Sequence, residues 1–289
     1  MDTLSTAFLG YIKEVVSLSK SSTLITEENV FQESAKDIRP YLDKMVGSLV
    51  LPGSGVEGLE NMDELFRLAE SGKSCLLLPE HYSNMDLSLV TYLLDEAGGR
   101  GKEISQSIIA IAGMKLSEED PVVSALASAY SRIIICPSRS YKNLDPEKDK
   151  AELIRANAIN RAATKAVIGK KYKGNIILIF PSGTRYRPGD PSTKQGVREI
   201  DAYIRSFYYM CLTAINGQVL HVNPDSMMDD EVTKDVVRIS FGPVISCDEF
   251  RSKARDDGGE DKKQAVADAI MAELEEMHIQ GIERRKQFL

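Results

Sequence analysis

The chain has 289 residues, of which 43% are hydrophobic and 27% are charged, so it can bury a large core in one domain or in one domain plus a smaller one. The net charge of −7 provides no overall positive field for nucleic acid, so any anion site must be local. The sequence predicts neither a transmembrane helix nor a secretory signal. Its four dispersed cysteines lack metal-site spacing, which indicates reduced, mostly buried thiols, a cytoplasmic protein and no bound metal.

The first fifty residues are predicted to form helices. Apolar residues recur at helical spacing over 4–18, and again in a stretch that begins after Thr26 and runs to Met45. Such stripes usually face a core or another helix, and contact with a membrane surface is the alternative. The Pro- and Gly-containing segment 51–55 interrupts the pattern. We therefore predict a small N-terminal helical domain over 1–50 and a second domain over 51–289.

Helices and strands alternate in the second domain. The predicted helices are 62–70, 87–94, 121–130, 151–168, 199–213 and 264–280. The predicted strands are 75–78, 106–112, 133–136, 175–180, 218–222 and 236–240. Gly281 is predicted to stop the last helix. This alternation predicts an α/β domain with a mixed, mainly parallel sheet flanked by helices, and functional sites where strands end.

Two glycine-containing segments resemble nucleotide-binding motifs only in their letters. Residues 53–58 match GxGxxG, but that motif needs a preceding strand, and helical sequence with a proline stands there instead. We interpret the segment as a linker turn. Gly72-Lys73-Ser74 resembles the end of a P-loop, yet Arg67 occupies the place of its first glycine, so we reject this match too.

His81 is the most informative of the three histidines. It follows the apolar strand 75–79 and opens a polar turn that ends at Asp86, where helical sequence begins. Such a turn can return the Asp86 carboxylate to the imidazole, so that the carboxylate holds the Nδ1 proton and Nε2 acts as a base. The alternative is that Asp86 only caps the helix.

Two further strands run into basic loops. The strand 176–180 leads to a turn that carries Arg185 and Arg187, and the strand 133–136 leads to Arg139 and Lys142. Guanidinium groups suit a phosphate, whereas solvated surface charge is the alternative for each residue. If the three strands are neighbours, their loops place a base beside a phosphate site.

These blocks together resemble the glycerolipid acyltransferases. The resemblance rests on His81-x4-Asp86, on the turn 180–185 (Phe-Pro-Ser-Gly-Thr-Arg) and on the lead-in 58–61 (Gly-Leu-Glu-Asn). The Pro-Ser-Gly-x-Arg-x-Arg-Pro form over 181–188 is similar to the soluble, plastid-type glycerol-3-phosphate acyltransferases, which also carry a helical domain before an α/β domain. The similarity runs from about residue 50 to 245. Glu80 departs from the family, because membrane-type members usually carry Asn before the histidine.

The resemblance implies transfer of a fatty acyl group from a thioester to a hydroxyl of glycerol 3-phosphate, the first step of phospholipid synthesis, without a cofactor. His81 and Asp86 would be catalytic, and Arg185 and Arg187 would hold the phosphate. Between these two motifs the family carries a further one, and the loop after the strand 133–136 matches it only loosely. Arg139 or Lys142 would be the basic residue of this motif.

The sequence leaves the donor and several alternatives open. Coenzyme A and acyl carrier protein are both acidic, and the basic segment 161–173 either docks such a carrier or is an exposed, lysine-rich helix end. A 1-acyl-glycerol-3-phosphate acceptor is the first alternative function. A serine hydrolase using Ser182 is another, although GxSxG is absent, and a non-catalytic lipid- or carrier-binding protein is the last. Acyl-chain preference, oligomeric state and peripheral membrane contact are not fixed.

Overall fold

The computed structural model describes residues 2–19, 24–118, 120–141, 144–223 and 226–289. The chain forms two compact units, each built from separate segments. Unit 1 consists of Met1–Ala7, Asp43–Ile108 and Lys171–Leu289, and unit 2 consists of Phe8–Leu42 and Ile109–Lys170. The N-terminal region is helical as predicted, with α1 (Leu4–Ala7), α2 (Leu9–Leu18) and α3 (Arg39–Leu49). A separate domain over 1–50 stays a prediction.

Unit 1 contains a mixed, mainly parallel sheet, which confirms the predicted α/β class. Its strand order is β6 (Ile176–Leu178), β3 (Cys75–Pro79), β7 (Tyr209–Asn216), β10 (Arg238–Phe241) and β2 (Gly55–Glu57). β3 runs parallel to both β6 and β7, and β10 runs parallel to β2. β10 and β11 (Ile245–Ser246) pair antiparallel with β7. Because β3 and β6 are parallel neighbours, the loops that follow them leave the same edge of the sheet.

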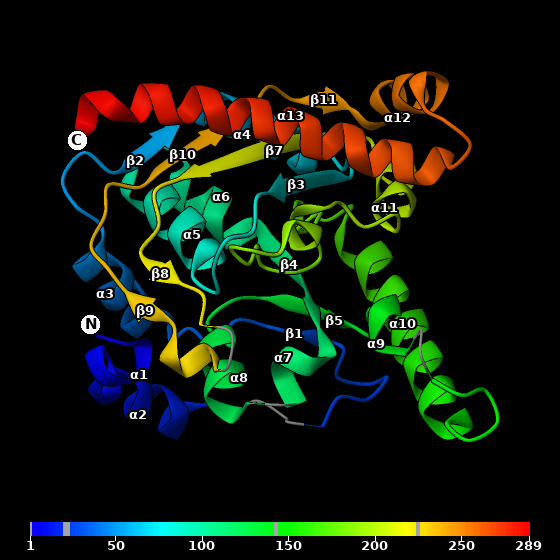
Figure 1. The fold of residues 1–289 in the computed structure, drawn as a ribbon, viewed down its shortest axis with the longest axis horizontal. Helices are drawn as coiled ribbons and strands as arrows, with labels where there is room; N and C mark the ends of the chain where they lie inside the picture. The colour runs from blue at the N-terminus through cyan, green and yellow to red at the C-terminus, as the bar shows by residue number, and fades with distance from the viewer. Residues whose placement is uncertain (1, 20–23, 119, 142–143, 224–225) are drawn as a thin grey trace. The chain divides into compact units, whose positions relative to one another are not determined.

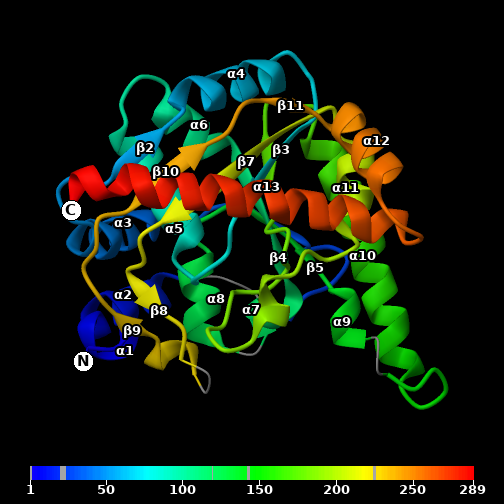
Figure 2. The same ribbon diagram turned by 45° about the horizontal axis from the view of Figure 1, so that its top comes forward.

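Helices cover both faces of this sheet. Figure 1 shows α13 (Lys262–Arg285) in front of β7 and β10 and α4 (Leu59–Glu70) behind them, and in the turned view of Figure 2 α4 appears above these strands. The remaining helices of unit 1 are α5 (Asp86–Glu96), α6 (Gly101–Ser107), α11 (Ile200–Ser206) and α12 (Cys247–Asp257). A short ladder of β8 (Leu220–His221) and β9 (Glu231–Val232) lies beside α1. Strands buried on both faces read as continuous apolar runs, as β3 does.

Unit 2 holds a second group of strands in the order β1 (Phe31–Gln32), β5 (Arg132–Ile135) and β4 (Ile108–Gly113). β5 is antiparallel to β1 and parallel to β4. The other helices of this unit are α7 (Met114–Glu118), α8 (Pro121–Ala127), α9 (Ser138–Tyr141) and α10 (Lys150–Lys170). Asn160 of α10 bonds both the amide and the carbonyl of Cys136, at 2.9 and 3.0 Å, and so fixes α10 to the end of β5.

Several predicted elements are wrong, each for an identifiable reason. The predicted helix 199–213 ends at Ser206, and its second half belongs to β7. Nearly every residue of β7 is buried, so the strand lacks the alternation that would have separated it from a helix. The linker turn over 53–58 contains β2, whose backbone pairs with β10. Phe31 belongs to a strand rather than to the predicted second helix, because it pairs with Ile133 of β5.

Gly281 does not stop the last helix, which continues to Arg285. A Cβ atom at Gly281 would lie 1.8 Å from Oδ1 of Asn216, in β7. The glycine is therefore required for the close approach of α13 to the sheet.

All four cysteines are buried and free of disulfides, as predicted. Across the described residues, no helix is both long and apolar enough to cross a membrane.

Candidate active site

The turn after β3 brings His81 and Asp86 into direct contact. Nδ1 of His81 lies 2.9 Å from Oδ2 of Asp86, whose side chain is 2% exposed. Asp86 also accepts hydrogen bonds from the amides of Tyr82 and Ser83, at 2.6 and 2.9 Å, and from the Ser83 hydroxyl at 2.8 Å. The carboxylate thus caps the turn and holds the imidazole at once. Because a carboxylate only accepts, we assign the proton to Nδ1, which leaves Nε2 with a free lone pair.

The turn after β6 contacts the same imidazole. The Phe180 ring stacks on His81, with 3.8 Å between ring centroids and 15° between planes. Gly183 adopts a φ of +62° in a turn closed by its own amide, which donates to the Phe180 carbonyl at 2.9 Å. The Tyr186 amide then donates to the His81 carbonyl at 2.8 Å. The two motif blocks are therefore joined by a ring stack and a backbone hydrogen bond.

The two arginines of this turn have different surroundings. Nη1 of Arg185 lies 2.7 Å from Oδ2 of Asp230, and their side chains are 12% and 0% exposed. The Asn223 amide donates to the other carboxylate oxygen of Asp230. Burial raises the pKa of Asp230, and the hydrogen bonds from Asn223 and Arg185 oppose that rise. Within the described residues, the exposed Arg187 side chain has no such partner, although its amide donates to Thr193.

Three further residues were proposed for the site from the sequence: Arg139, Lys142 and Ser182. Arg139 lies on α9 in unit 2, so its contact with a phosphate stays a prediction. Lys142 lies outside the described residues. The Ser182 hydroxyl donates to the Thr184 carbonyl at 2.7 Å, and the described structure places no hydrogen bond between Ser182 and His81. This geometry does not support the serine hydrolase alternative.

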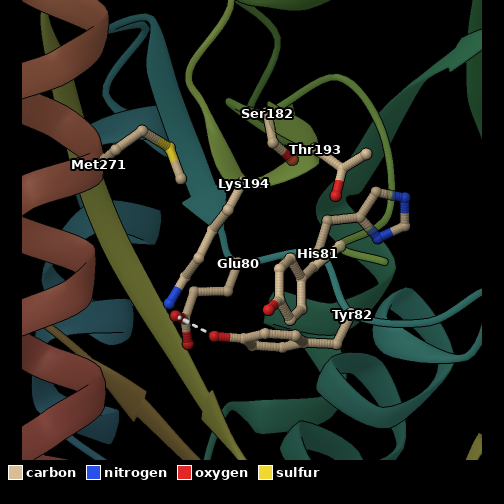
Figure 3. Close-up of a pocket in the computed structure, with 8 residues that line it drawn as sticks. Glu80, His81, Tyr82, Ser182, Thr193, Lys194 and Met271 are labelled. Atoms are coloured by element: carbon tan, nitrogen blue, oxygen red, sulfur yellow. Dashed lines mark hydrogen bonds between the residues drawn. The ribbon is translucent and has the colours of Figure 1, made fainter. Parts of the chain in front are cut away.

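A small pocket opens beside the imidazole (Figure 3). It is lined by residues of both turns, of the segment after them and of α13: Glu80, His81, Tyr82, Ser182, Tyr186, Thr193, Lys194 and Met271. The ammonium of Lys194 is paired with Glu275 of α13. The pocket thus places apolar and hydrogen-bonding groups around His81.

Comparison with known proteins identifies the family. The model of the acyltransferase family matches residues 54–210, more than half of the chain. The chain belongs to the acyltransferase family. No curated protein is similar enough to match it. The matched region includes the turn from His81 to Asp86 and the turn from Phe180 to Arg187, so its chemistry is acyl transfer to a glycerolipid precursor.

Sequence reasoning assigned no role to Glu80, Tyr82 and His278, three polar residues beside the proposed catalytic pair, or to Asp230, the partner of Arg185. The buried Glu80 bonds the Tyr82 hydroxyl and also His278, which lies 198 residues further along the chain. Glu80 stood out in the sequence only as a departure from the family pattern. His278 falls in an amphipathic helix whose spacing carries no sign of its partner, so only the packing of α13 shows their contact.

Proposed function

We propose that this acyltransferase moves a fatty acyl group from an acyl thioester to a hydroxyl of glycerol 3-phosphate. The observation that supports this most is the hydrogen bond from the Tyr186 amide to the His81 carbonyl, which holds the arginine-bearing turn against the base. A guanidinium and an imidazole on joined turns suit a substrate that carries both a phosphate and a hydroxyl.

The proposed reaction uses one proton shuttle. Nε2 of His81 removes the proton of the acceptor hydroxyl while its oxygen attacks the thioester carbonyl. The tetrahedral intermediate then expels the thiolate, which takes the proton back from the imidazolium. Asp86 keeps Nδ1 protonated and stabilises the cation between these steps. General-base catalysis of this kind contributes about 10²–10⁴-fold.

Phosphate binding is assigned to Arg187 and Arg185 in different ways. Arg187 is exposed and unpaired among the described residues, so its fork is available to the ligand. Arg185 already pairs with Asp230, which orients its guanidinium and leaves its other nitrogen atoms for the phosphate. Arg139 or Lys142 completes the proposed set.

The donor is proposed to be acyl-coenzyme A or acyl carrier protein, and the reaction takes place in the cytoplasm without a further cofactor. The basic segment 161–173 exposes fewer charged side chains for contact with a carrier than the sequence suggested. Lys171 is buried, and its ammonium donates to the Ser206 carbonyl. The carrier would therefore meet the exposed residues Arg161 and Lys165 of α10.

A purified-enzyme assay tests the proposal. Glycerol 3-phosphate and 1-acyl-glycerol 3-phosphate are compared as acceptors, each with acyl-coenzyme A and with acyl carrier protein loaded with the same chain. We expect the higher kcat/KM with glycerol 3-phosphate, and no turnover after His81→Ala. A preference for the acylated acceptor would assign the second step instead, and full activity of His81→Ala would refute the base assignment.

A further inference from the structure

A second buried carboxylate lies next to the catalytic pair. Glu80 follows β3 directly, and its side chain is 4% exposed. Oε1 accepts a hydrogen bond from the Tyr82 hydroxyl at 2.7 Å. Oε2 accepts from the Ile215 amide at 2.8 Å and lies 2.9 Å from Nδ1 of His278. We assign a proton to this Nδ1, because a carboxylate only accepts. Each carboxylate oxygen therefore has a donor from the protein, and these donors come from the catalytic turn, from β7 and from α13.

Tyr82 connects this carboxylate to the catalytic one. Its backbone amide donates to Oδ2 of Asp86 at 2.6 Å, and its hydroxyl donates to Glu80. Burial, followed by the nearby Glu80 charge, raises the pKa of Tyr82 above its usual range, so the hydroxyl stays protonated. The ring lines the pocket and meets Tyr186 edge-on, with 6.1 Å between centroids. Fixing the Tyr82 side chain therefore also fixes the amide that bonds Asp86.

α13 is held closely at the level of His278. The Asn216 side chain donates to the His278 carbonyl at 2.9 Å. One turn further along the helix, Gly281 leaves room for Asn216, as described above. The position of the His278 ring is thus set by the contact between α13 and β7, and Glu80 receives a donor with a fixed direction.

We propose that Glu80 and His278 are positioning residues, which act through Tyr82 to hold Asp86 and His81 in their catalytic geometry. This inference rests on acyl transfer with His81 as the base. The positioning role also gives a reason for a glutamate at position 80, directly before His81. Three donors converge at this position, and a carboxylate accepts from all of them, whereas an amide would present its own donors to at least one.

Substitutions separate positioning from general stability. Tyr82→Phe removes a single hydroxyl, and His278→Leu removes the imidazole donor. We expect each to lower kcat by about 10- to 100-fold while the KM of both substrates stays within about twofold, because misplacement by a fraction of an ångström acts on the chemical step. His278→Asn offers an N–H where Nδ1 of the imidazole lies, so it should restore most of kcat.

Arg284→Ala is the matched control on α13. Arg284 bonds Glu57 at 2.8 Å and plays no part in the pocket, so its loss should lower Tm without changing kcat. If Tyr82→Phe and His278→Leu also lower only Tm, or if His278→Asn fails to restore kcat in a folded protein, the positioning role is refuted.

A spectroscopic measurement keeps this test independent of the acceptor. The chain has three histidines, so the ring resonances of His81 can be assigned by substitution and followed by NMR. We expect Tyr82→Phe to shift them and Arg284→Ala to leave them unchanged. If the protein acylates no glycerol phosphate, the proposed function is rejected. A shift of the His81 ring resonances in Tyr82→Phe would still support the positioning role in that case. Unchanged His81 resonances in Tyr82→Phe would overturn the positioning role.

Discussion

Asp86→Asn separates the charge of the proposed catalytic carboxylate from its geometry. An asparagine oxygen at the place of Oδ2 still accepts from His81, Tyr82 and Ser83. The new amide group stands at the place of Oδ1, where it meets the Ser83 hydroxyl. That hydroxyl can rotate to accept from it, because the Met85 amide uses only one of the two lone pairs of the Ser83 oxygen. The turn should therefore keep its shape while the negative charge disappears.

The size of the effect follows from the distance between the two groups. Oδ2 of Asp86 and Nδ1 of His81 are 2.9 Å apart in a largely buried setting. Opposite unit charges at such a separation attract by roughly 6 kcal/mol at an effective dielectric constant of about 20. The asparagine dipole retains part of this attraction, so the imidazolium of the transition state loses about 3–4 kcal/mol. We expect kcat to fall by about 10²–10³-fold.

Steady-state kinetics at saturating donor, with Tm measured by circular dichroism, checks this expectation. KM for the acceptor should stay within about threefold of the wild type, because the carboxylate makes no proposed contact with the ground-state phosphate. Asp86→Ala is the contrasting variant. It leaves buried donors unpaired at about 1–3 kcal/mol each and should lower Tm strongly. An Asp86→Asn enzyme with normal Tm and kcat within threefold of wild type would refute the electrostatic role.

Three further predictions concern other parts of the chain. Gly281→Ala should destabilise the fold by about 1–3 kcal/mol in urea unfolding. Gly169→Ala, in an open part of α10, should be neutral or stabilising. Equal effects of the two substitutions would contradict the close contact between Gly281 and Asn216. Burial raises the pKa of Cys75, Cys211 and Cys247 to about 12, so at pH 8 only about one of these thiols in 10⁴ is ionised. The native protein should therefore react with a disulfide reagent far more slowly than the unfolded protein until the pH approaches 12. Asp230→Asn should raise the acceptor KM by about tenfold with little change in kcat, because Arg185 loses its orienting partner; a lowered KM would instead show that Asp230 competes with the phosphate.

Local patterns predicted the elements whose signal lies within one segment. The buried residues of α10 recur every three or four positions, and β3 is a short apolar run between polar segments; both were located within a few residues. β7 was lost because a strand covered on both faces has no period of two. β1 is only two residues long, and its strand character comes from pairing with β5. In each failure the deciding contact is with residues distant in sequence.

The same distinction applies to the site. His81 and Asp86 are five residues apart, so the turn itself suffices to bring them together. The stacking of Phe180 on His81 requires β3 and β6 to be neighbours, which the sequence left only as a condition and the structure shows. Asp230 reaches Arg185 across 45 residues, and no spacing pattern contains that information. The contact between the two residues proposed to perform chemistry was thus within reach of the sequence, whereas the groups that orient them depended on packing.

Glu80 and Asp86 are two buried carboxylates near His81, and of these two only Asp86 bonds its imidazole. In an extended segment, successive side chains point to opposite sides, so residues 80 and 82 share one side and residue 81 faces the other. The hydrogen bond between Glu80 and Tyr82 and the stacking of His81 on Phe180 fit this alternation. Asp86 then bonds the imidazole from α5, and Glu80 bonds α13 through His278. The donors to the two carboxylates do not overlap, so the charge of Asp86 can stabilise the imidazolium while that of Glu80 holds the turn in place. A substitution of Asp86 and a substitution of Glu80 should therefore differ in their effects on the His81 ring resonances.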